Sequence, residues 1–261
     1  MKGKNVVVTG GGTNIGRAIT LAFAVEGSNV AIAELNRTAG EQVAAEVNAM
    51  DNGATAIVVD ADVTDKARTD AMMAELVSRL GGVDVLVNNV GWTIDRLFVE
   101  KSRDEHVKEV DLNLWGAINC INAVLPHMID RQSGSIVSIS SDAGRMGEYR
   151  EAVYSACKAG VIALSKSIAR ETGRYGLRLN MVCPGLVVPA QQDVSNPDSM
   201  WAQGMQDIFT EDVLERVRRA YPLRRMGTAQ EVANAVVFLA SDAASFITGQ
   251  TLSVSGGYTM M

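Results

Sequence analysis

A tyrosine and a lysine four residues apart are the side chains of this sequence best suited to proton transfer. Tyr154 and Lys158 stand in the segment Tyr-Ser-Ala-Cys-Lys, which we expect to be helical, and residues at that spacing share one helix face. A phenol with a pKa near ~10 needs about 4 kcal/mol of preferential phenolate stabilisation to act as a base at neutral pH. The Lys158 ammonium is one source of that stabilisation, and a cationic cofactor is another. On spacing alone, an ordinary pair on a helix surface is the alternative.

Two further polar residues stand where they can join this pair. Ser141 lies thirteen residues before Tyr154 and directly follows the apolar run Ser135–Ser140, which we interpret as a strand. Ligands bind at the carboxyl ends of strands in parallel sheets, so this position favours a site. Asn113, in the first half of a long helical stretch, is placed to bridge a water molecule to Lys158.

A glycine-rich loop follows the first predicted strand. The strand Asn5–Thr9 runs into Gly-Gly-Gly-Thr-Asn-Ile-Gly, and a helical segment opens within that loop. Glycines let the backbone approach a pyrophosphate, and the helix N-terminus offers N–H donors. The loop therefore predicts nucleotide binding, with a structural turn as the alternative. The residues expected to meet the phosphates are Gly10, Thr13, Asn14, Ile15 and Gly16.

An acidic residue ends the second predicted strand. Glu34 lies eighteen residues after Gly16, where a carboxylate accepts both hydroxyls of an adenosine ribose and repels a 2′-phosphate. Arg37 could instead bind that phosphate, but Thr13 in the loop is neutral. NAD is therefore favoured over NADP as the cofactor, and a solvated glutamate is the alternative interpretation of Glu34.

The segments between these motifs alternate in character along the whole chain. Apolar runs separated by helix-length crossovers predict a doubly wound parallel α/β sheet of about seven strands with helices on both faces. The expected strands are Asn5–Thr9, Asn29–Glu34, Ala54–Val59, Val83–Asn88, Ser135–Ser140, Arg178–Val182 and Thr251–Val254. The expected helices are Ile15–Glu26, Thr38–Met50, Lys66–Leu80, Ser102–Ile129, Ala152–Tyr175 and Gln230–Ala240.

We predict a single domain over residues 1–261, with a substrate lid at about 185–215. No linker or repeat interrupts the alternation, and a long irregular stretch inside a compact domain is usually functional. Two more strand ends fall on the same rim as Ser141. Asp62 and Val63 close the third strand, where Asp62 could hold the adenine amino group, and Asn89 closes the fourth.

Composition excludes several classes of protein. The chain has 24 basic and 30 acidic residues, a net charge of −6 that disfavours nucleic-acid binding. Hydrophobic residues make up 47% and charged residues 21%, as in a globular protein. No run of apolar residues is long enough to span a membrane, and the N-terminus is expected to form a strand and not a signal peptide. A cytoplasmic enzyme is the resulting expectation.

The cysteines and histidines give no sign of a metal or disulfide site. The 3 cysteines are widely spaced and odd in number, and only 2 histidines accompany them. We therefore expect no metal. Cys157, beside Lys158, is interpreted as a small packing residue in a helix interior.

Taken together, these motifs resemble the short-chain dehydrogenase/reductase family over nearly the whole chain, from Thr9 to the closing Ser255-Gly256-Gly257. The resemblance implies a Rossmann fold and a homotetramer formed through the two long helices and the C-terminal strand. It implies that Tyr154 is the general acid/base and that Ser141 orients the substrate oxygen. By the same resemblance Lys158 lowers the tyrosine pKa and holds the nicotinamide ribose, Asn113 maintains a proton-relay water, and Val187 meets the nicotinamide carboxamide.

The chain departs from the family pattern at two positions. Asn14 stands where the family loop has its middle glycine, and asparagine tolerates the left-handed backbone better than most residues. Pro189 replaces a threonine four residues after Pro184-Gly185, which puts one contact to the carboxamide in doubt.

Substrate choice is the least determined feature. Large apolar side chains gather in the expected lid and across the cleft from it, which predicts either a large hydrophobic ligand or simply packing of the loop. In the lid they are Met200, Trp201, Met205, Ile208 and Phe209, and across the cleft they are Trp92, Met146 and Tyr149. Arg145 and Arg150 are candidates for an anion such as a coenzyme A phosphate.

Local segments such as Ser141-Asp142-Ala143-Gly144-Arg145 resemble bacterial dehydrogenases of alicyclic hydroxyacyl-CoA thioesters. Three functions follow. The first is NAD-dependent oxidation of such an alcohol, the second is NADPH-dependent reduction of a 3-oxoacyl carrier-protein thioester, and the third is nucleotide binding without catalysis.

Overall fold

The computed structural model describes residues 1–189 and 209–261, and every strand in these ranges belongs to one sheet. The sheet has seven parallel strands in the order β3-β2-β1-β4-β5-β6-β7. The chain thus winds outward from β1 in one direction and from β4 in the other. The strands are β1 Asn5–Thr9, β2 Asn29–Glu34, β3 Ala56–Asp60, β4 Val85–Asn88, β5 Gly134–Ile139, β6 Leu177–Pro184 and β7 Thr251–Val254.

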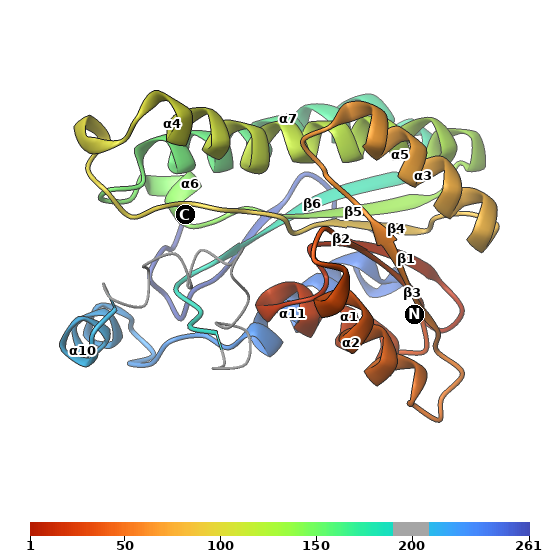
Figure 1. Cartoon of the computed structure of the whole chain (residues 1–261), viewed down its shortest axis with the longest axis horizontal. Helices are drawn as coiled ribbons and strands as arrows, with labels where there is room; N and C mark the ends of the chain where they lie inside the picture. The colour runs from red at the N-terminus through yellow and green to blue at the C-terminus, as the bar shows by residue number, and fades with distance from the viewer. Residues whose placement is uncertain (190–208) are drawn as a thin grey trace.

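Helices cover both faces of this sheet, as Figure 1 shows. One layer contains α1 (Asn14–Val25), α2 (Arg37–Asn48) and α11 (Ala229–Ala240). The opposite layer contains α3 (Lys66–Leu80), α4 (Arg103–Val110), α5 (Gly116–Arg131) and α7 (Ala152–Thr172). The short α6 (Ala143–Met146) follows β5, and α10 (Glu211–Ala220) lies apart from both layers, at the left of Figure 1.

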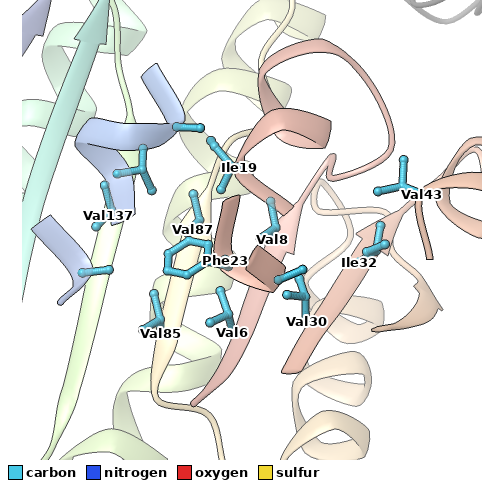
Figure 2. Close-up of a cluster of buried hydrophobic side chains, with 14 of the residues drawn as sticks. Val6, Val8, Ile19, Phe23, Val30, Ile32, Val43, Val85, Val87 and Val137 are labelled. Carbon is cyan, nitrogen blue, oxygen red and sulfur yellow. The ribbon is translucent and has the colours of Figure 1, made fainter. Parts of the chain in front are cut away.

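The core consists of two apolar clusters, one on each face of the sheet. Val6 and Val8 of β1 pack with Phe23 of α1 on one side, and Figure 2 shows this cluster. Val7, between them, points to the other side and packs with Leu86 of β4. Successive strand residues face opposite ways, so a strand covered on both faces is apolar at nearly every position.

The predicted fold class is confirmed, and most element boundaries agree within two residues. Two differences concern the site. The stretch expected as one helix from Ser102 to Ile129 is divided into α4 and α5 by a π-helical turn over Asp111–Trp115. Short α6 and α10 were not predicted.

The helix α10 overlaps the predicted lid at 185–215. Its composition explains why it forms: Glu211 and Asp212 lie in its first turn and Arg218 and Arg219 in its last, which complements the helix dipole. The central part of the lid, with Met200, Trp201, Met205 and Ile208, lies outside the described residues.

No helix in residues 1–189 and 209–261 combines the length and the apolar character needed to cross a membrane.

Candidate active site

The glycine loop between β1 and α1 has the backbone that the sequence pattern predicts. Gly10 adopts φ +62°, in the left-handed region. A Cβ on Gly16 would lie 1.8 Å from the Gly10 carbonyl oxygen, so no side chain fits there. Asn14, which replaces the family's middle glycine, has φ +42°, a conformation that asparagine tolerates better than most residues. The loop therefore keeps its shape despite this departure.

The start of α1 suits an anion. Thr13 precedes the helix in an extended conformation, its side chain makes no capping hydrogen bond, and the first turn contains no acidic residue. The first N–H groups of a helix have no partner within the helix and carry a partial positive charge. These residues fit the pyrophosphate of a dinucleotide.

Glu34, at the end of β2, faces the same loop. Its carboxylate accepts hydrogen bonds from the Gly12 N–H at 2.9 Å and from the Asn36 N–H at 3.2 Å. Arg37, the cation that could have favoured a 2′-phosphate, forms an ion pair at 2.7 Å with Glu41 on its own helix. The charge nearest the loop at this strand end is therefore negative.

The remaining strand ends also support the loop. The Asn89 side chain donates to the carbonyls of Thr9 and Gly10, each at 3.1 Å, and so ties β4 to the glycine loop. Asp62 accepts from the Thr64 hydroxyl at 2.6 Å and lies 3.6 Å from Arg68, and Asn119 donates to the Val63 carbonyl at 2.9 Å.

Tyr154 and Lys158 lie on successive turns of α7 and meet as predicted. The Lys158 Nζ is 5.4 Å from the centre of the Tyr154 ring and donates to the Ile139 carbonyl at 3.0 Å. Lys158 is buried, and burial lowers its pKa to about 8. This hydrogen bond to the end of β5 holds the Lys158 ammonium near the phenol of Tyr154.

Ser141 follows β5 and lies beside the phenol. Its Oγ accepts the Ala143 N–H at 3.1 Å, which starts α6, and a hydrogen bond between the side chains of Ser141 and Tyr154 favours the phenolate. Burial, followed by the charge of Glu151, acts in the opposite direction and raises the pKa of Tyr154 above its ordinary value. Without a further positive charge nearby, the phenol of Tyr154 therefore stays protonated at neutral pH.

Asn113 stands in the π-helical turn between α4 and α5, and its side chain is held on three sides. Its Nδ2 donates to the carbonyls of Trp92 at 2.6 Å and Glu109 at 2.8 Å, and its Oδ1 accepts the Trp92 N–H at 3.1 Å. A Cβ on Gly91 would lie 3.0 Å from Lys158 Nζ and 3.2 Å from Asn113 Oδ1. Gly91 thus allows Asn113 and Lys158 to approach the same point.

A cavity of about 10 Å³ adjoins Asn113 and Lys158, with the polar residues Thr9, Asn88 and Ser138 in its wall. This volume is close to that needed for one water molecule, which also requires several polar partners. The geometry thus suits the water expected between Asn113 and Lys158.

A much larger cavity of about 570 Å³ brings the two halves of the site together. Its wall includes the loop residues Asn14 and Ile15 together with Ser141, Tyr154 and Lys158. Val187, predicted to meet the carboxamide, also lines it and is held by a bridge to Gly227. On the far side, α10 and its neighbours contribute the apolar side chains Phe209, Val213, Val217 and Ala220.

The residues considered for the substrate side have the following surroundings. Arg145 donates to Ser253 Oγ at 2.9 Å, and Arg150 pairs with Asp95 at 2.5 Å, so both are engaged within the protein. Trp92 is buried with Lys108 Nζ 3.9 Å from its ring centre. Neither Trp92 nor Met146 lines the large cavity within the described residues, whereas Tyr149 does.

The sequence analysis missed the carboxyl groups of this cavity. Asp95, Glu148 and Glu151 line its wall close to Tyr154. The two glutamates fall within the short segment between Ser141 and Tyr154, and that was the available signal. Cys157 is buried and burial raises the pKa of its thiol, consistent with a packing role. No cluster of metal-ligating side chains occurs in the described part of the chain.

The comparisons with known proteins agree with this geometry. A family model described as Enoyl-(Acyl carrier protein) reductase matches residues 10–259. The chain belongs to the short-chain dehydrogenase/reductase family. It is accordingly an NAD(P)-dependent oxidoreductase of the ketoreductase type.

Curated members of this family match the chain over its full length. The 3-oxoacyl-[acyl-carrier-protein] reductase FabG of Staphylococcus epidermidis is 40% identical over 258 residues, covering 98% of this chain and 99% of the relative. The protein of the same name from Staphylococcus aureus is 39% identical over 258 residues, with 98% of each chain covered. That from Thermotoga maritima is 33% identical over 257 residues, again with 98% of each covered.

These names support the family and leave the finer resemblance untested. The relatives are named as 3-oxoacyl-[acyl-carrier-protein] reductases and not as dehydrogenases of alicyclic hydroxyacyl-CoA thioesters such as 2-hydroxycyclohexanecarboxyl-CoA dehydrogenase. Among the functions considered from the sequence, the 3-oxoacyl thioester reductase therefore fits better than the first.

Proposed function

We propose that this short-chain dehydrogenase/reductase interconverts 3-oxoacyl and 3-hydroxyacyl thioesters with NAD(H) as cofactor. The observation that carries the proposal is the single cavity in which Ser141, Tyr154 and Lys158 meet the glycine-loop residues. The full-length similarity to 3-oxoacyl-[acyl-carrier-protein] reductases supports the substrate class.

Tyr154 is the proton donor of the reduction in this proposal. When bound, the nicotinamide ring supplies the hydride. The Tyr154 hydroxyl delivers a proton to the substrate oxygen, and the Ser141 hydroxyl, which lines the same cavity, holds that oxygen. In the oxidation direction the same phenol must accept the proton, which requires its pKa to fall.

Lys158 contributes to this fall but does not produce it alone, because the pKa of Tyr154 stays above its ordinary value with Lys158 in place. Its ammonium lies 5.4 Å from the phenol ring centre, and an adjacent cation favours a phenolate. The small cavity next to Lys158 and Asn113 supports a water through which the proton returns to solvent. Asn113 acts as a positioning residue for this water, because it lines the small cavity. Its side chain is itself held by hydrogen bonds to the backbone of Trp92.

The dinucleotide is held by the glycine loop and the neighbouring strand ends. Gly10, Thr13, Asn14, Ile15 and Gly16 surround the pyrophosphate, while Asp62, Val63 and Asn89 form the adenosine side of the site. Val187 meets the carboxamide. Glu34 supports NAD over NADP, because a carboxylate at the end of β2 would repel a 2′-phosphate.

A second candidate is NAD-dependent oxidation of a bulky or alicyclic hydroxyacyl-CoA. The apolar side chains that α10 presents to the cavity favour it, since they suit a large hydrophobic group. Both candidates share the reaction at the secondary alcohol and differ in the group attached to it.

We also propose a single domain over residues 1–261, a cytoplasmic location and a homotetramer. The cysteines of the described residues are free, as in a reducing compartment. Trp115 is 50% exposed next to the long helices, and Leu252 of β7 is 40% exposed, which supports contacts with other subunits at these elements.

The test is a comparison of substrates with the purified protein. We expect NADH to be consumed with acetoacetyl-CoA or a 3-oxoacyl carrier-protein thioester, and little activity with alicyclic hydroxyacyl-CoA thioesters and NAD. Higher kcat/KM for an alicyclic hydroxyacyl-CoA would favour the second candidate, and activity with neither class would refute the substrate assignment.

A further inference from the structure

The cavity wall beside Tyr154 carries three carboxyl groups that the reaction described above does not use. They are Asp95, which follows β4, and Glu148 and Glu151, which precede α7. Carboxyl groups near an apolar cavity are costly unless each has a partner, so the partner of each decides its role.

Two of the three have partners within the protein. Asp95 forms an ion pair with Arg150 Nε at 2.5 Å, and Arg150 also donates to the Asp95 carbonyl at 2.9 Å. Glu148 accepts from the Tyr258 hydroxyl at 2.9 Å and from the Tyr149 N–H at 3.0 Å. These two groups are held in place by the fold.

Glu151 differs from them. Within residues 1–189 and 209–261 its side chain forms no hydrogen bond or ion pair, and it does not cap α7 although it stands at the N-terminal end of that helix. It stands at the N-cap of α7, three residues before Tyr154, and both residues line the cavity. The Glu151 carboxyl therefore faces the space where substrate binds.

The charges around Glu151 favour its protonated form. Glu148, Asp95 and Glu109 surround it with negative charge, and Lys101 opposes them. That lysine is itself in a buried ion pair with Glu109 at 2.5 Å. Burial, together with these carboxylates, raises the pKa of Glu151 to about 7. A protonated carboxyl group is a hydrogen-bond donor, whereas an ionised one only accepts.

We propose that Glu151 is a specificity-determining residue that, in its protonated form, donates a hydrogen bond to an oxygen of the substrate next to the reacting carbonyl. A 3-oxoacyl thioester carries such an oxygen on its thioester carbonyl, whose carbon lies two bonds from the carbon that is reduced. The inference rests on the proposed function and adds a residue that distinguishes these thioesters from simple ketones.

The test uses two variants and the pH dependence of kcat/KM for acetoacetyl-CoA. Glu151→Gln keeps a donor at every pH, and Glu151→Leu has none. We expect wild-type kcat/KM to fall above a pH of about 7, at the ionisation of Glu151. In Glu151→Gln that fall disappears, and kcat/KM at lower pH stays at the wild-type value. In Glu151→Leu kcat/KM at low pH is about tenfold lower than in the wild type, mainly through a higher KM.

Glu148→Gln is the matched control. The negative charge of Glu148 raises the pKa of Glu151 in the wild type. The Glu148→Gln variant therefore keeps the fall in kcat/KM but shows it at a lower pH. Unchanged NADH binding and melting temperature show that the variants fold.

Two results overturn the inference alone: a Glu151→Gln profile like that of the wild type, or a Glu151→Leu variant as active as Glu151→Gln. Failure of the wild type to reduce acetoacetyl-CoA with NADH or NADPH overturns the proposed function, and this inference with it.

Discussion

Cofactor choice in this enzyme is predicted to depend on the charge of a single side chain, Glu34. Its carboxylate accepts the N–H groups of Gly12 and Asn36 and lies at the end of β2, where the adenosine ribose binds in a sheet of this kind. The change to test is Glu34→Gln, which keeps the size and an acceptor oxygen for Gly12 but removes the charge.

The magnitude follows from the hydrogen bonds involved. Bonds to a charged group contribute about 1.5–3 kcal/mol each, compared with about 1 kcal/mol for neutral ones. Loss of the charge should therefore weaken NADH binding by roughly 0.5–2 kcal/mol, or about twofold to thirtyfold in Kd. NADPH binding should improve at the same time, because the carboxylate no longer repels the 2′-phosphate.

The assay is titration of the purified protein with NADH and NADPH, followed by the fluorescence of the reduced cofactor. Arg37→Gln is the control, since this exposed arginine pairs with Glu41 and should leave the NADH Kd unchanged. A wild-type protein that binds NADPH as tightly as NADH, or a Glu34→Gln variant with an unchanged ratio of the two Kd values, would refute this reasoning.

Three further predictions concern stability. Asn14→Ala should unfold about 1 kcal/mol more easily than Asn14→Gly in urea, because φ is +42° there; equal stabilities would contradict the strain argument. Lys158→Met should abolish turnover yet raise the free energy of unfolding at neutral pH by on the order of 1–3 kcal/mol. Burial depresses the pKa of Lys158 from 10.5 to about 8. The free energy of unfolding of the wild type should therefore rise between pH 8 and pH 10.5, whereas the free energy of unfolding of Lys158→Met should not. Thr228→Ala, which removes the capping box with Glu231, should cost about 1 kcal/mol, measured by thermal unfolding; no change in melting temperature would contradict it.

The sheet and its main covering helices were predictable because they are encoded locally. Strands β1 and β2 are uninterrupted apolar runs ended by polar or glycine residues, and helix-length segments separate them. Such a pattern permits only a parallel sheet with helices on both faces. The π-helical turn at Asp111–Trp115 was not predicted, and Asn113 within it bonds Trp92, a contact between residues distant in the sequence.

The site was predictable in its proton-transfer part and not in its substrate part. Tyr154 and Lys158 are neighbours on one helix, so their spacing alone brings them together. The partners of Arg150 and Glu148 depend on tertiary packing, which joins Arg150 to Asp95 and Glu148 to Tyr258. Arg150, which looked available for substrate in the sequence, is therefore already paired, and the place of Glu148 in the cavity wall was missed.

The most direct test of the account is the turnover of Tyr154→Phe, measured together with its affinity for NADH. In the proposed reaction the phenol supplies the proton, so the variant should bind NADH with the wild-type Kd and lose roughly 10²–10⁴-fold in kcat. A Tyr154→Phe enzyme that binds cofactor normally and keeps kcat within about threefold of the wild type would contradict the central role of this phenol.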